Sequence, residues 1–210
     1  MRLSAHDLWF GYDDRPILDG VEFSASTGEA VAIVGPSGVG KTTLLSLLGG
    51  MQRPRTGRVE VDGDSAVGRQ VSWVLQTVNV LANRSVLDNV ALGPLVDGRS
   101  RREALAIAKR RLREVGLDAL ADAPARKVSG GELQRVVIAR ALASNRPFLL
   151  ADEPTGQLDR VTTDQIVECL LLARAERGLI VVTHDPAVAA RCDRRYELVD
   201  GLLREPEVAS

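Results

Sequence analysis

The sequence predicts an α/β fold: a core built on a parallel sheet, an antiparallel β subdomain at the N-terminus and a helical subdomain inserted in the middle. Three observations carry this prediction. An apolar run at residues 30–34 leads into a glycine-rich loop and then a helical pattern. A second apolar run at residues 148–151 is typical of a buried parallel strand. Between them, residues 77–128 turn to helical patterns. A length of 210 residues fits one domain, residues 1–210.

The N-terminal part predicts strands that pair in the antiparallel sense. Residues 3–34 alternate short apolar runs with turn signals such as Asp13-Asp14, a spacing that favours a small antiparallel sheet. Residues 57–63 read GRVEVDG, which predicts another strand with its alternate valines on one face.

Residues 35–43 read GPSGVGKTT and have the pattern of a phosphate-binding loop. Its glycines let backbone N–H groups converge on phosphate oxygens, and the following helix adds the positive end of its dipole. Lys41 is expected to reach the β- and γ-phosphates, and the Thr42 hydroxyl to sit on Mg²⁺. A glycine-rich turn beside a lysine is the alternative, disfavoured because every motif position is filled between a strand and a helix. The predicted nucleotide-binding residues are Gly35, Pro36, Ser37, Gly38, Val39, Gly40, Lys41, Thr42 and Thr43.

Two acids, Asp152 and Glu153, follow the apolar run of residues 148–151. Carboxylates at the C-terminal end of a parallel strand lie where α/β sheets bind ligands. Asp152 suits the acid that helps hold Mg²⁺ opposite a phosphate-binding loop. Two solvated acids at a strand end are the ordinary alternative. The site is favoured because the phosphate-binding loop requires an acid at such a place.

Within residues 77–128, a helix is predicted to start with a capping box at Ser100 and Glu103 and to end at Gly116. Its apolar stripe is predicted to consist of Leu105, Ala108, Leu112 and Val115. Several arginines on this helix could form a nucleic-acid patch. A solvated helix face is favoured, because glutamates are interspersed and no aromatic residues alternate with the arginines.

Residues 128–142 read VSGGELQRVVIARAL, and two interpretations are open for their start. Ser129 and Glu132 fit a capping box at the head of an amphipathic helix. A cap needs only the serine, however. Gly130 and Gly131 weaken a helix start and leave N–H groups bare, which suits an anion better than a core.

These segments, in this order, resemble the ATP-binding cassette (ABC) ATPases over nearly the whole chain, from Leu8 to about Gly201. The resemblance implies a P-loop NTPase fold with a RecA-like core. It identifies Ser129, Gly130 and Gly131 with the signature motif, which binds the γ-phosphate of ATP held by the opposite subunit. Asp152 then corresponds to the Walker B acid.

The same resemblance assigns further roles. Glu153 corresponds to the catalytic glutamate that polarises the attacking water, and His184 to a histidine that contacts the γ-phosphate and that water. Gln76 resembles the Q-loop glutamine, which senses Mg²⁺ and the membrane partner. Tyr12 resembles the aromatic residue that stacks on adenine. Residues 156–159 resemble the D-loop, which crosses the dimer interface.

Within the family, the loop and the length resemble the small ATPases of lipoprotein release, macrolide export and cell division. One departure is visible between residues 63 and 76. That group usually carries a longer insertion with a basic segment there, and this chain has only residues 64–75. The hydrolytic residues are unaffected, and the cargo is not predicted.

Composition limits the partners. The formal net charge is −1, so no nucleic-acid partner is expected. Cys169 and Cys192 lack metal-ligand spacing, which fits a reducing compartment. No apolar run approaches the roughly 20 residues of a membrane span, and the first ten residues do not resemble a signal peptide. The expected location is therefore the cytoplasmic face of the membrane, through separate membrane subunits.

The expected function is ATP hydrolysis that powers an ABC transporter. The predicted cofactors are ATP and Mg²⁺, with Thr42, Gln76 and Asp152 as metal ligands. The predicted partners are a second nucleotide-binding subunit, in a homo- or heterodimer, and integral membrane permease subunits. A soluble ABC ATPase acting on DNA or ribosomes is the alternative. It is disfavoured because the chain lacks a long coiled-coil insertion and a second cassette. A regulatory cassette that does not hydrolyse ATP is disfavoured by Glu153 and His184.

Overall fold

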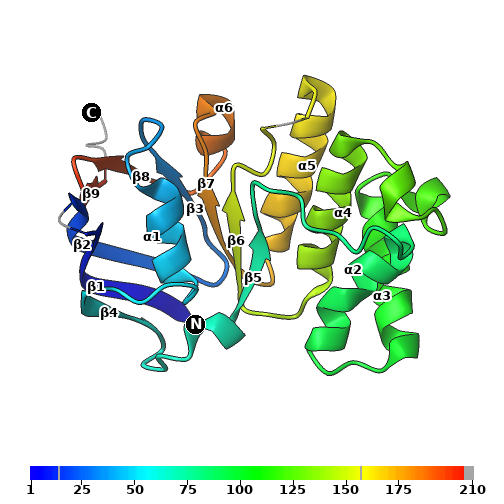
Figure 1. The fold of residues 1–210 in the computed structure, drawn as a ribbon, viewed down its shortest axis with the longest axis horizontal. Coiled ribbons are helices and arrows are strands. Elements are labelled where there is room, and N and C mark those ends of the chain that lie inside the picture. Colours follow the sequence, from blue (N-terminus) through cyan, green and yellow to red (C-terminus); the bar gives the residue numbers. More distant parts are fainter. Residues whose placement is uncertain (14, 157, 206–210) are drawn as a thin grey trace.

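A six-stranded sheet forms the centre of the computed structural model, which describes residues 1–13, 15–156 and 158–205 (Figure 1). Asp14 of the predicted turn and Gln157 of the predicted D-loop lie outside the described residues. The strand order is β5-β6-β7-β3-β8-β9, parallel except for the antiparallel pair β8 and β9. The strands are β3 (Ala30–Val34), β5 (Val71–Val74), β6 (Phe148–Asp152), β7 (Gly178–Val182), β8 (Arg194–Val199) and β9 (Leu202–Arg204). The predicted α/β class is confirmed.

The central strands are apolar because they are covered on both faces. Every residue of β6 and β7 is buried. Along β6, Leu149 and Ala151 join one apolar cluster, while Phe148 and Leu150 join the cluster on the other face. A run of consecutive apolar residues is the signature of such a strand, which explains why the apolar residues 148–151 could be assigned from the sequence.

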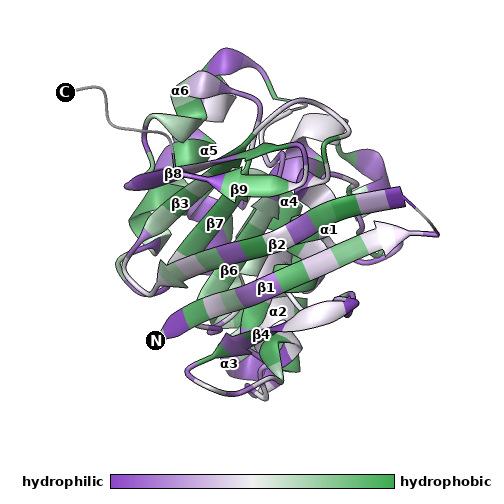
Figure 2. Cartoon of the chain, turned by 90° about the vertical axis from the view of Figure 1, so that its left-hand side faces the viewer, coloured by the Kyte–Doolittle hydropathy of each residue, from purple (hydrophilic) through white to green (hydrophobic). Residues whose placement is uncertain are grey.

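The predicted antiparallel sheet is present, with a different membership. It has the order β2-β1-β4 and consists of β1 (Arg2–Tyr12), β2 (Arg15–Ser26) and β4 (Thr56–Val61). Figure 2 shows hydrophobic and hydrophilic residues alternating along β1 and β2, as expected for a sheet with one buried face. Residues 30–34 were predicted with this sheet, but β3 pairs in parallel with β7 and β8 instead. Its unbroken apolar run requires two covered faces, which only the central sheet provides.

Helix α1 (Lys41–Leu48) lies between the two sheets. Its four leucines belong to one apolar cluster with residues of β1 and β2 and with the near face of the central sheet. The opposite face of the central sheet shares its cluster with α4 (Gly130–Ala143) and α5 (Arg160–Ala173). The short helix α6 (Pro186–Ala189) follows β7. Helices thus cover both faces of the sheet, and the phosphate-binding loop connects β3 to α1.

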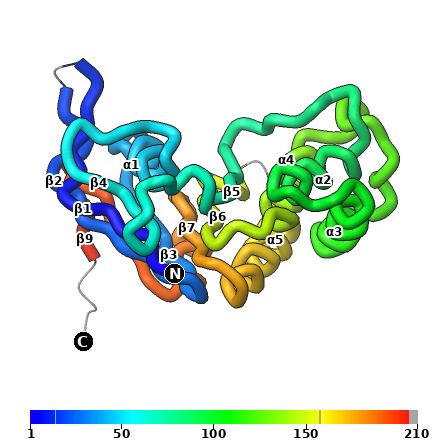
Figure 3. The backbone as a smooth tube through the Cα atoms, turned by 90° about the horizontal axis from the view of Figure 1, so that it is seen from below, coloured from blue at the N-terminus to red at the C-terminus, as the bar shows by residue number. Residues whose placement is uncertain are grey.

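The helical subdomain contains α2 (Val86–Val96) and α3 (Arg101–Glu114). Figure 3 shows it as a lobe reached from β5 by a long connection, and residues 77–85 of that connection are not helical. Helix α4 packs against both α2 and α3, so the helical layer continues beyond residue 128. No helix among the described residues is both long enough and apolar enough to cross a bilayer.

The local signals of α3 are confirmed with one exception. Ser100 and Glu103 form the predicted capping box, and Gly116 has the predicted left-handed backbone, with φ of 69°. Ala108, Leu112 and Val115 are buried as expected. Leu105 is only partly buried, and Ala104 takes the inward position beside them. The small side chain fits where α3 approaches α2.

Candidate functional site

The loop between β3 and α1 is shaped by two glycines. Gly35 and Gly40 have φ of 150° and 108°, values that side-chain-bearing residues rarely adopt. A Cβ atom at Gly35 would lie 2.5 Å from the carbonyl oxygen of Leu198, and one at Gly40 would lie 2.5 Å from Cγ2 of Ile17. Gly40 is the N-cap of α1, and no side chain caps this helix. The first N–H groups of α1 are therefore left to an anion.

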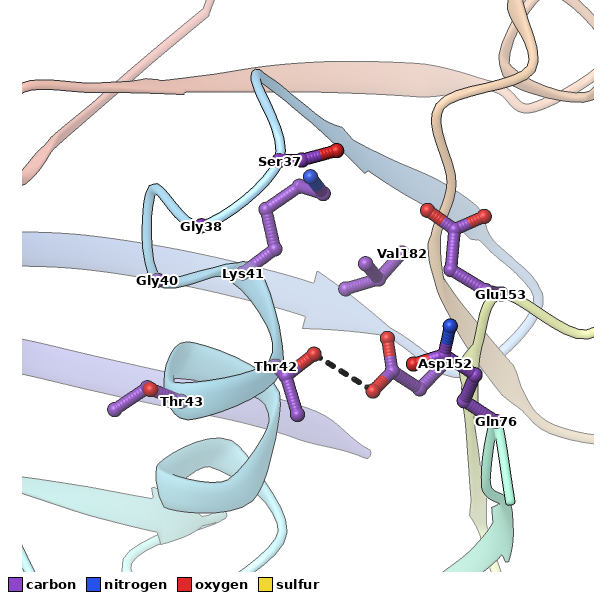
Figure 4. Close-up of a pocket in the computed structure, with 10 residues that line it drawn as sticks. All are labelled: Ser37, Gly38, Gly40, Lys41, Thr42, Thr43, Gln76, Asp152, Glu153 and Val182. Atoms are coloured by element: carbon purple, nitrogen blue, oxygen red, sulfur yellow. Dashed lines mark hydrogen bonds between the residues drawn. The ribbon is translucent and has the colours of Figure 1, made fainter.

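A pocket of about 300 Å³ opens beside this loop. Figure 4 shows Lys41 and Ser37 on the side of the phosphate-binding loop, facing the carboxyl ends of β5 and β6. The lining residues are Ser37, Gly38, Gly40, Lys41, Thr42, Thr43, Gln76, Asp152, Glu153 and Val182. The pocket thus brings together four segments that are far apart in the sequence.

Lys41 spans the loop from inside the pocket. Its side chain is buried, and Nζ donates hydrogen bonds to the carbonyl oxygens of Gly35 at 2.8 Å and Pro36 at 2.9 Å. Val39 packs against the apolar cluster beneath the loop. Gly35, Pro36 and Val39 therefore frame the loop rather than line the pocket, whereas the other predicted loop residues line it.

Thr42 and Asp152 meet across the pocket, 110 residues apart in the chain. The Thr42 hydroxyl donates to Oδ2 of Asp152 at 2.8 Å (Figure 4). Asp152 is only 3% exposed, and its Oδ1 has no hydrogen-bond partner among the described residues. Burial raises the pKa of the Asp152 carboxyl, and the hydrogen bond from Thr42 offsets part of that rise.

These groups fit a magnesium ion. A buried carboxylate with an unpaired oxygen, a hydroxyl and an amide oxygen form the hard-oxygen donor set that Mg²⁺ prefers. Gln76 follows β5 and its side chain lies next to Asp152 in Figure 4. The three residues predicted as metal ligands, Thr42, Gln76 and Asp152, all line the same pocket.

Glu153 has an unusual backbone. Its φ is 45°, in the left-handed region, although it is not glycine and precedes Pro154. Such a conformation costs about 1–3 kcal/mol and persists only where the surroundings enforce it. The Glu153 N–H donates to the carbonyl oxygen of Val182 at 2.9 Å, which extends the β6–β7 pairing by one residue. The bend turns the Glu153 carboxylate into the pocket.

His184 contacts Glu153 directly. Its ring Nδ1 lies 2.9 Å from Oε2 of Glu153, and its backbone N–H donates to the same oxygen at 3.4 Å. The His184 side chain is 69% exposed, whereas that of Glu153 is 14% exposed. The histidine therefore orients the carboxylate from the solvent side without itself lining the pocket.

Tyr12 lies outside the pocket lining. It ends β1, is 52% exposed, and stacks edge-to-face on Phe10 with a centroid distance of 5.2 Å. Its hydroxyl accepts a hydrogen bond from Gln52 at 3.1 Å. An exposed ring held in place on one side can stack on a flat ligand with its other side.

The SGG segment, which consists of Ser129, Gly130 and Gly131, also lies away from this pocket. Ser129 caps α4 with the predicted box: its Oγ accepts from the Glu132 N–H and its own N–H donates to the Glu132 carboxylate. Gly130 and Gly131 form the first turn, and none of the three residues lines the pocket. Ser129 and Gly130 are exposed. The segment is therefore available to another molecule.

Two residues near the site were missed by the sequence analysis. Val182 lines the pocket as the last residue of β7. Gln134 on α4 is buried, and its Nε2 donates to the carbonyl oxygen of Pro154 at 3.0 Å. Position 134 shares its helix face with the buried residues 137, 138 and 141, and this spacing was the available signal.

Known proteins resemble this chain over almost its full length. A family model described as ABC transporter matches residues 18–156. The lipoprotein-releasing system ATP-binding protein LolD of Chromohalobacter salexigens is 43% identical, covering 93% of this chain and 88% of the relative. The macrolide export ATP-binding/permease protein MacB of Rhodopirellula baltica is 40% identical over 95% of this chain and 31% of its own length.

Solved structures agree with these relatives. A dimeric post-hydrolysis state of the ATP-binding cassette MJ0796, bound to ADP and Pi, superimposes with a TM-score of 0.83. It is 30% identical and covers 97% of this chain and 98% of its own. An ATP-binding subunit of an ABC transporter superimposes with a TM-score of 0.89 at 26% identity, over 98% of this chain and 90% of its own.

Proposed function

This chain belongs to the ABC transporter family, and we propose that it acts as one of two ATP-binding subunits that close on each other around ATP. It is an ATP-hydrolysing subunit that powers an ABC transporter. The proposal concerns how its residues do so, with which partners, and where. A soluble ABC ATPase acting on DNA or ribosomes is not favoured by these relatives.

The division of the site between two surfaces carries the proposal. One chain provides a pocket with the phosphate-binding loop and the acids, and it keeps Ser129 and Gly130 exposed outside that pocket. The SGG segment of a second chain can then complete the nucleotide site. The dimer reported for MJ0796 supports this arrangement. Each closed pair would contain two such sites.

The chemistry follows from the groups that line the pocket. Lys41 exchanges its hydrogen bonds to the loop carbonyls for phosphate oxygens of ATP. Thr42, Asp152 and Gln76 would hold Mg²⁺, and the bound ion would supply positive charge against the β- and γ-phosphates. Tyr12 stacks on the adenine ring.

Glu153 is the residue that polarises water. Its carboxylate faces the pocket on one side. On the other side it contacts Nδ1 of His184, which keeps the carboxylate oriented. A water oxygen attacks the γ-phosphorus in line, the bond from phosphorus to the ADP oxygen breaks, and ADP and phosphate leave. Catalysis is positioning and charge neutralisation, with no covalent intermediate on the protein.

The Glu153→Gln variant tests this role. The amide keeps the size of the side chain but removes the charge that polarises water, so turnover should collapse while ATP binding survives. An ATP-bound dimer should accumulate and be visible by size-exclusion chromatography with ATP and Mg²⁺. Near wild-type turnover in this variant would remove Glu153 from the catalytic role.

For the membrane partner, we propose docking beside residues 77–92. Val86, Leu87 and Val90 are buried and belong to the core of the helical subdomain. Leu81, by contrast, is 48% exposed, although its backbone is fixed at both ends. The side chain of buried Asn89 accepts from the Leu81 N–H at 2.7 Å and donates to the Leu81 carbonyl at 3.1 Å.

An apolar side chain held outward by a buried asparagine is suited to contact a partner. Val78 and Val80 are partly buried beside it against the apolar cluster. We therefore propose that this surface receives a segment of an integral membrane permease, which places the chain on the cytoplasmic face of the membrane. Cargo selection then lies with the permease.

The variant Leu81→Glu tests the docking. Co-purification with a membrane protein from detergent-solubilised membranes should drop, while the ATPase activity of the isolated chain persists. Val96→Glu is the matched control, because Val96 is also an exposed apolar residue, 70% exposed, at the far end of α2. Loss of solubility or of intrinsic turnover in Leu81→Glu would assign Leu81 to the core instead. Recovery of ribosomes or DNA with the wild-type chain would favour the soluble alternative.

A further inference from the structure

Gln134 is a buried polar residue that the hydrolytic scheme above does not use. Its side chain is 2% exposed, and Nε2 donates to the carbonyl oxygen of Pro154 at 3.0 Å. Its Oε1 is buried and has no hydrogen-bond partner among the described residues. A buried amide with only one of its two polar atoms hydrogen-bonded costs free energy that an apolar side chain at this position would not. The hydrogen bond to Pro154 is therefore the feature that distinguishes glutamine from an apolar residue here.

The carbonyl that Gln134 holds lies directly after the strained glutamate. Glu153 has φ of 45°, and its N–H is fixed by the carbonyl oxygen of Val182 at 2.9 Å. Its own carbonyl accepts from the Gly156 N–H at 3.3 Å. The bend is thus held on one side by β7 and on the other side by α4 through Gln134. A shift of either support changes the direction of the Glu153 carboxylate.

Helix α4 carries this contact close to its N-terminus. Gln134 is five residues after Ser129, about 7.5 Å along the helix axis. The next residue, Arg135, donates from Nη1 to the carbonyl oxygen of Val115 at 3.1 Å, at the end of α3. Two adjacent residues of α4 therefore connect this one helix to the helical subdomain and to the loop that contains Glu153. Movement of the head of α4 reaches both.

We propose that Gln134 is a positioning residue that sets Glu153 according to the position of α4. Nucleotide held by the partner contacts residues 129–131 and thereby fixes the position of α4. Through its hydrogen bond to the Pro154 carbonyl, Gln134 then adjusts the orientation of Glu153 in the chain's own site to that position of α4. The two sites of the dimer are thereby coupled. This inference rests on the proposed two-chain site, and it adds the connection between the sites.

The test compares Gln134→Met with Ser72→Ala. Methionine matches glutamine in length and lacks the donor. Ser72 is the matched control: it is buried, and its Oγ donates to the carbonyl oxygen of Phe148 at 3.2 Å, at the opposite end of β6. Both variants lose one buried hydrogen bond from a side chain to the main chain of the same strand region. A purely structural role predicts similar effects.

Gln134→Met should lower kcat by about tenfold or more relative to Ser72→Ala, because a misdirected general base is costly. The KM for ATP should stay within about twofold, since the phosphate-binding loop is untouched. The Hill coefficient for ATP should fall toward one. Gln134→Glu, which keeps the shape but has no donor when ionised, should show the same loss and serves if the methionine variant folds poorly.

Equal kcat values in Gln134→Met and Ser72→Ala, with both variants folded, would overturn the role of Gln134. An unchanged Hill coefficient with reduced kcat would overturn the coupling. Dimerisation is measured separately, by adding ATP to Glu153→Gln with and without Gln134→Met. Both proteins should dimerise. If Glu153→Gln alone stays monomeric, the two-chain site fails, and that result is distinguishable from a failure confined to Gln134.

Discussion

The two helices whose N-termini we propose to bind ATP, α1 and α4, begin differently. Helix α1 begins after Gly40, with no side-chain cap and no acid in its first turn. Helix α4 begins after Ser129, whose Oγ accepts from the Glu132 N–H at 3.4 Å and donates to the Glu132 carboxylate at 2.8 Å. The first end has no side-chain cap, whereas the second has a serine that accepts from the Glu132 N–H.

In the proposed two-chain site, α1 would meet the phosphates of ATP in its own chain, and α4 would meet the γ-phosphate of ATP held by the partner. The bare end of α1 is enclosed in a pocket of its own chain, so its N–H groups need no other partner once ATP binds. The capped end of α4 is exposed in the single chain, and an exposed helix end without a cap is less stable. The capping box and the signature interpretation are therefore compatible. In the proposed dimer, the serine that caps α4 would also contact the nucleotide held by the partner.

The largest effect is expected from Gly131→Asp. Among the described residues, a Cβ atom at Gly131 would meet Cδ2 of Leu158 alone, at 3.5 Å, so the monomer should fold and bind nucleotide. The new carboxylate would face the partner's γ-phosphate, and ATP-driven dimerisation should be abolished in sedimentation measurements. Gly131→Asn, equal in size without the charge, should lose less. A variant that unfolds, with normal dimerisation of its folded fraction, would leave α4 with a cap only.

Lys41→Ala should act at the other helix end. Removing a cation from the β- and γ-phosphates should weaken ATP binding by about 10- to 100-fold, because hydrogen bonds to charged groups contribute about 1.5–3 kcal/mol. Isothermal titration with ATP on the monomer measures it. The nucleotide-free protein also loses two hydrogen bonds to loop carbonyls, so its melting temperature is recorded as the control. Unchanged affinity would contradict the role of this loop.

Asp152→Asn tests whether the α1 site is maintained at the expense of stability. The variant should abolish turnover yet stabilise the nucleotide-free protein by about 0.5–2 kcal/mol in urea unfolding, within the range of single stabilising substitutions. Burial raises the pKa of the Asp152 carboxyl, so the penalty is complete above the folded pKa. This free-energy penalty disappears as pH falls below the pKa of aspartate in the unfolded chain, about 3.9. The stability gained by Asp152→Asn should therefore shrink at such low pH. A less stable variant at neutral pH would contradict this explanation.

The smallest effects separate the two functions of Ser129. Helix α3 has the same capping box in Ser100 and Glu103, far from any phosphate-binding residue. Ser129→Ala and Ser100→Ala should each cost about 1 kcal/mol of stability at pH 7. Only Ser129→Ala should also weaken ATP-driven dimerisation. Equal dimerisation in both variants would show that Ser129 is a cap and nothing more.

The acid of the α4 box gives that cap a pH dependence. The hydrogen bonds from the Ser129 N–H and hydroxyl lower the pKa of Glu132 below its ordinary value. The stabilisation is therefore present above the ordinary carboxyl pKa and lost as pH falls through the lowered one. The comparison of the serine variants belongs at neutral pH, where both boxes are complete.

The sequence by itself determined the parts whose geometry is local. The glycine-rich loop, the two capping boxes and the left-handed end of α3 depend on residues within a few positions of each other. Backbone geometry fixes their shape once the residue types are given. The apolar runs of the central strands were recognisable for a similar reason, because burial on both faces requires every residue to be apolar.

Only the tertiary structure decided which of these parts meet. It joined Thr42 to Asp152, gave Glu153 its left-handed bend against β7, and assigned β3 to the central sheet. It buried Gln134 beside the Pro154 carbonyl and left residues 129–131 outside the pocket. Strand pairing and the choice of buried face depend on contacts between residues far apart in the chain, and local preferences do not fix these contacts.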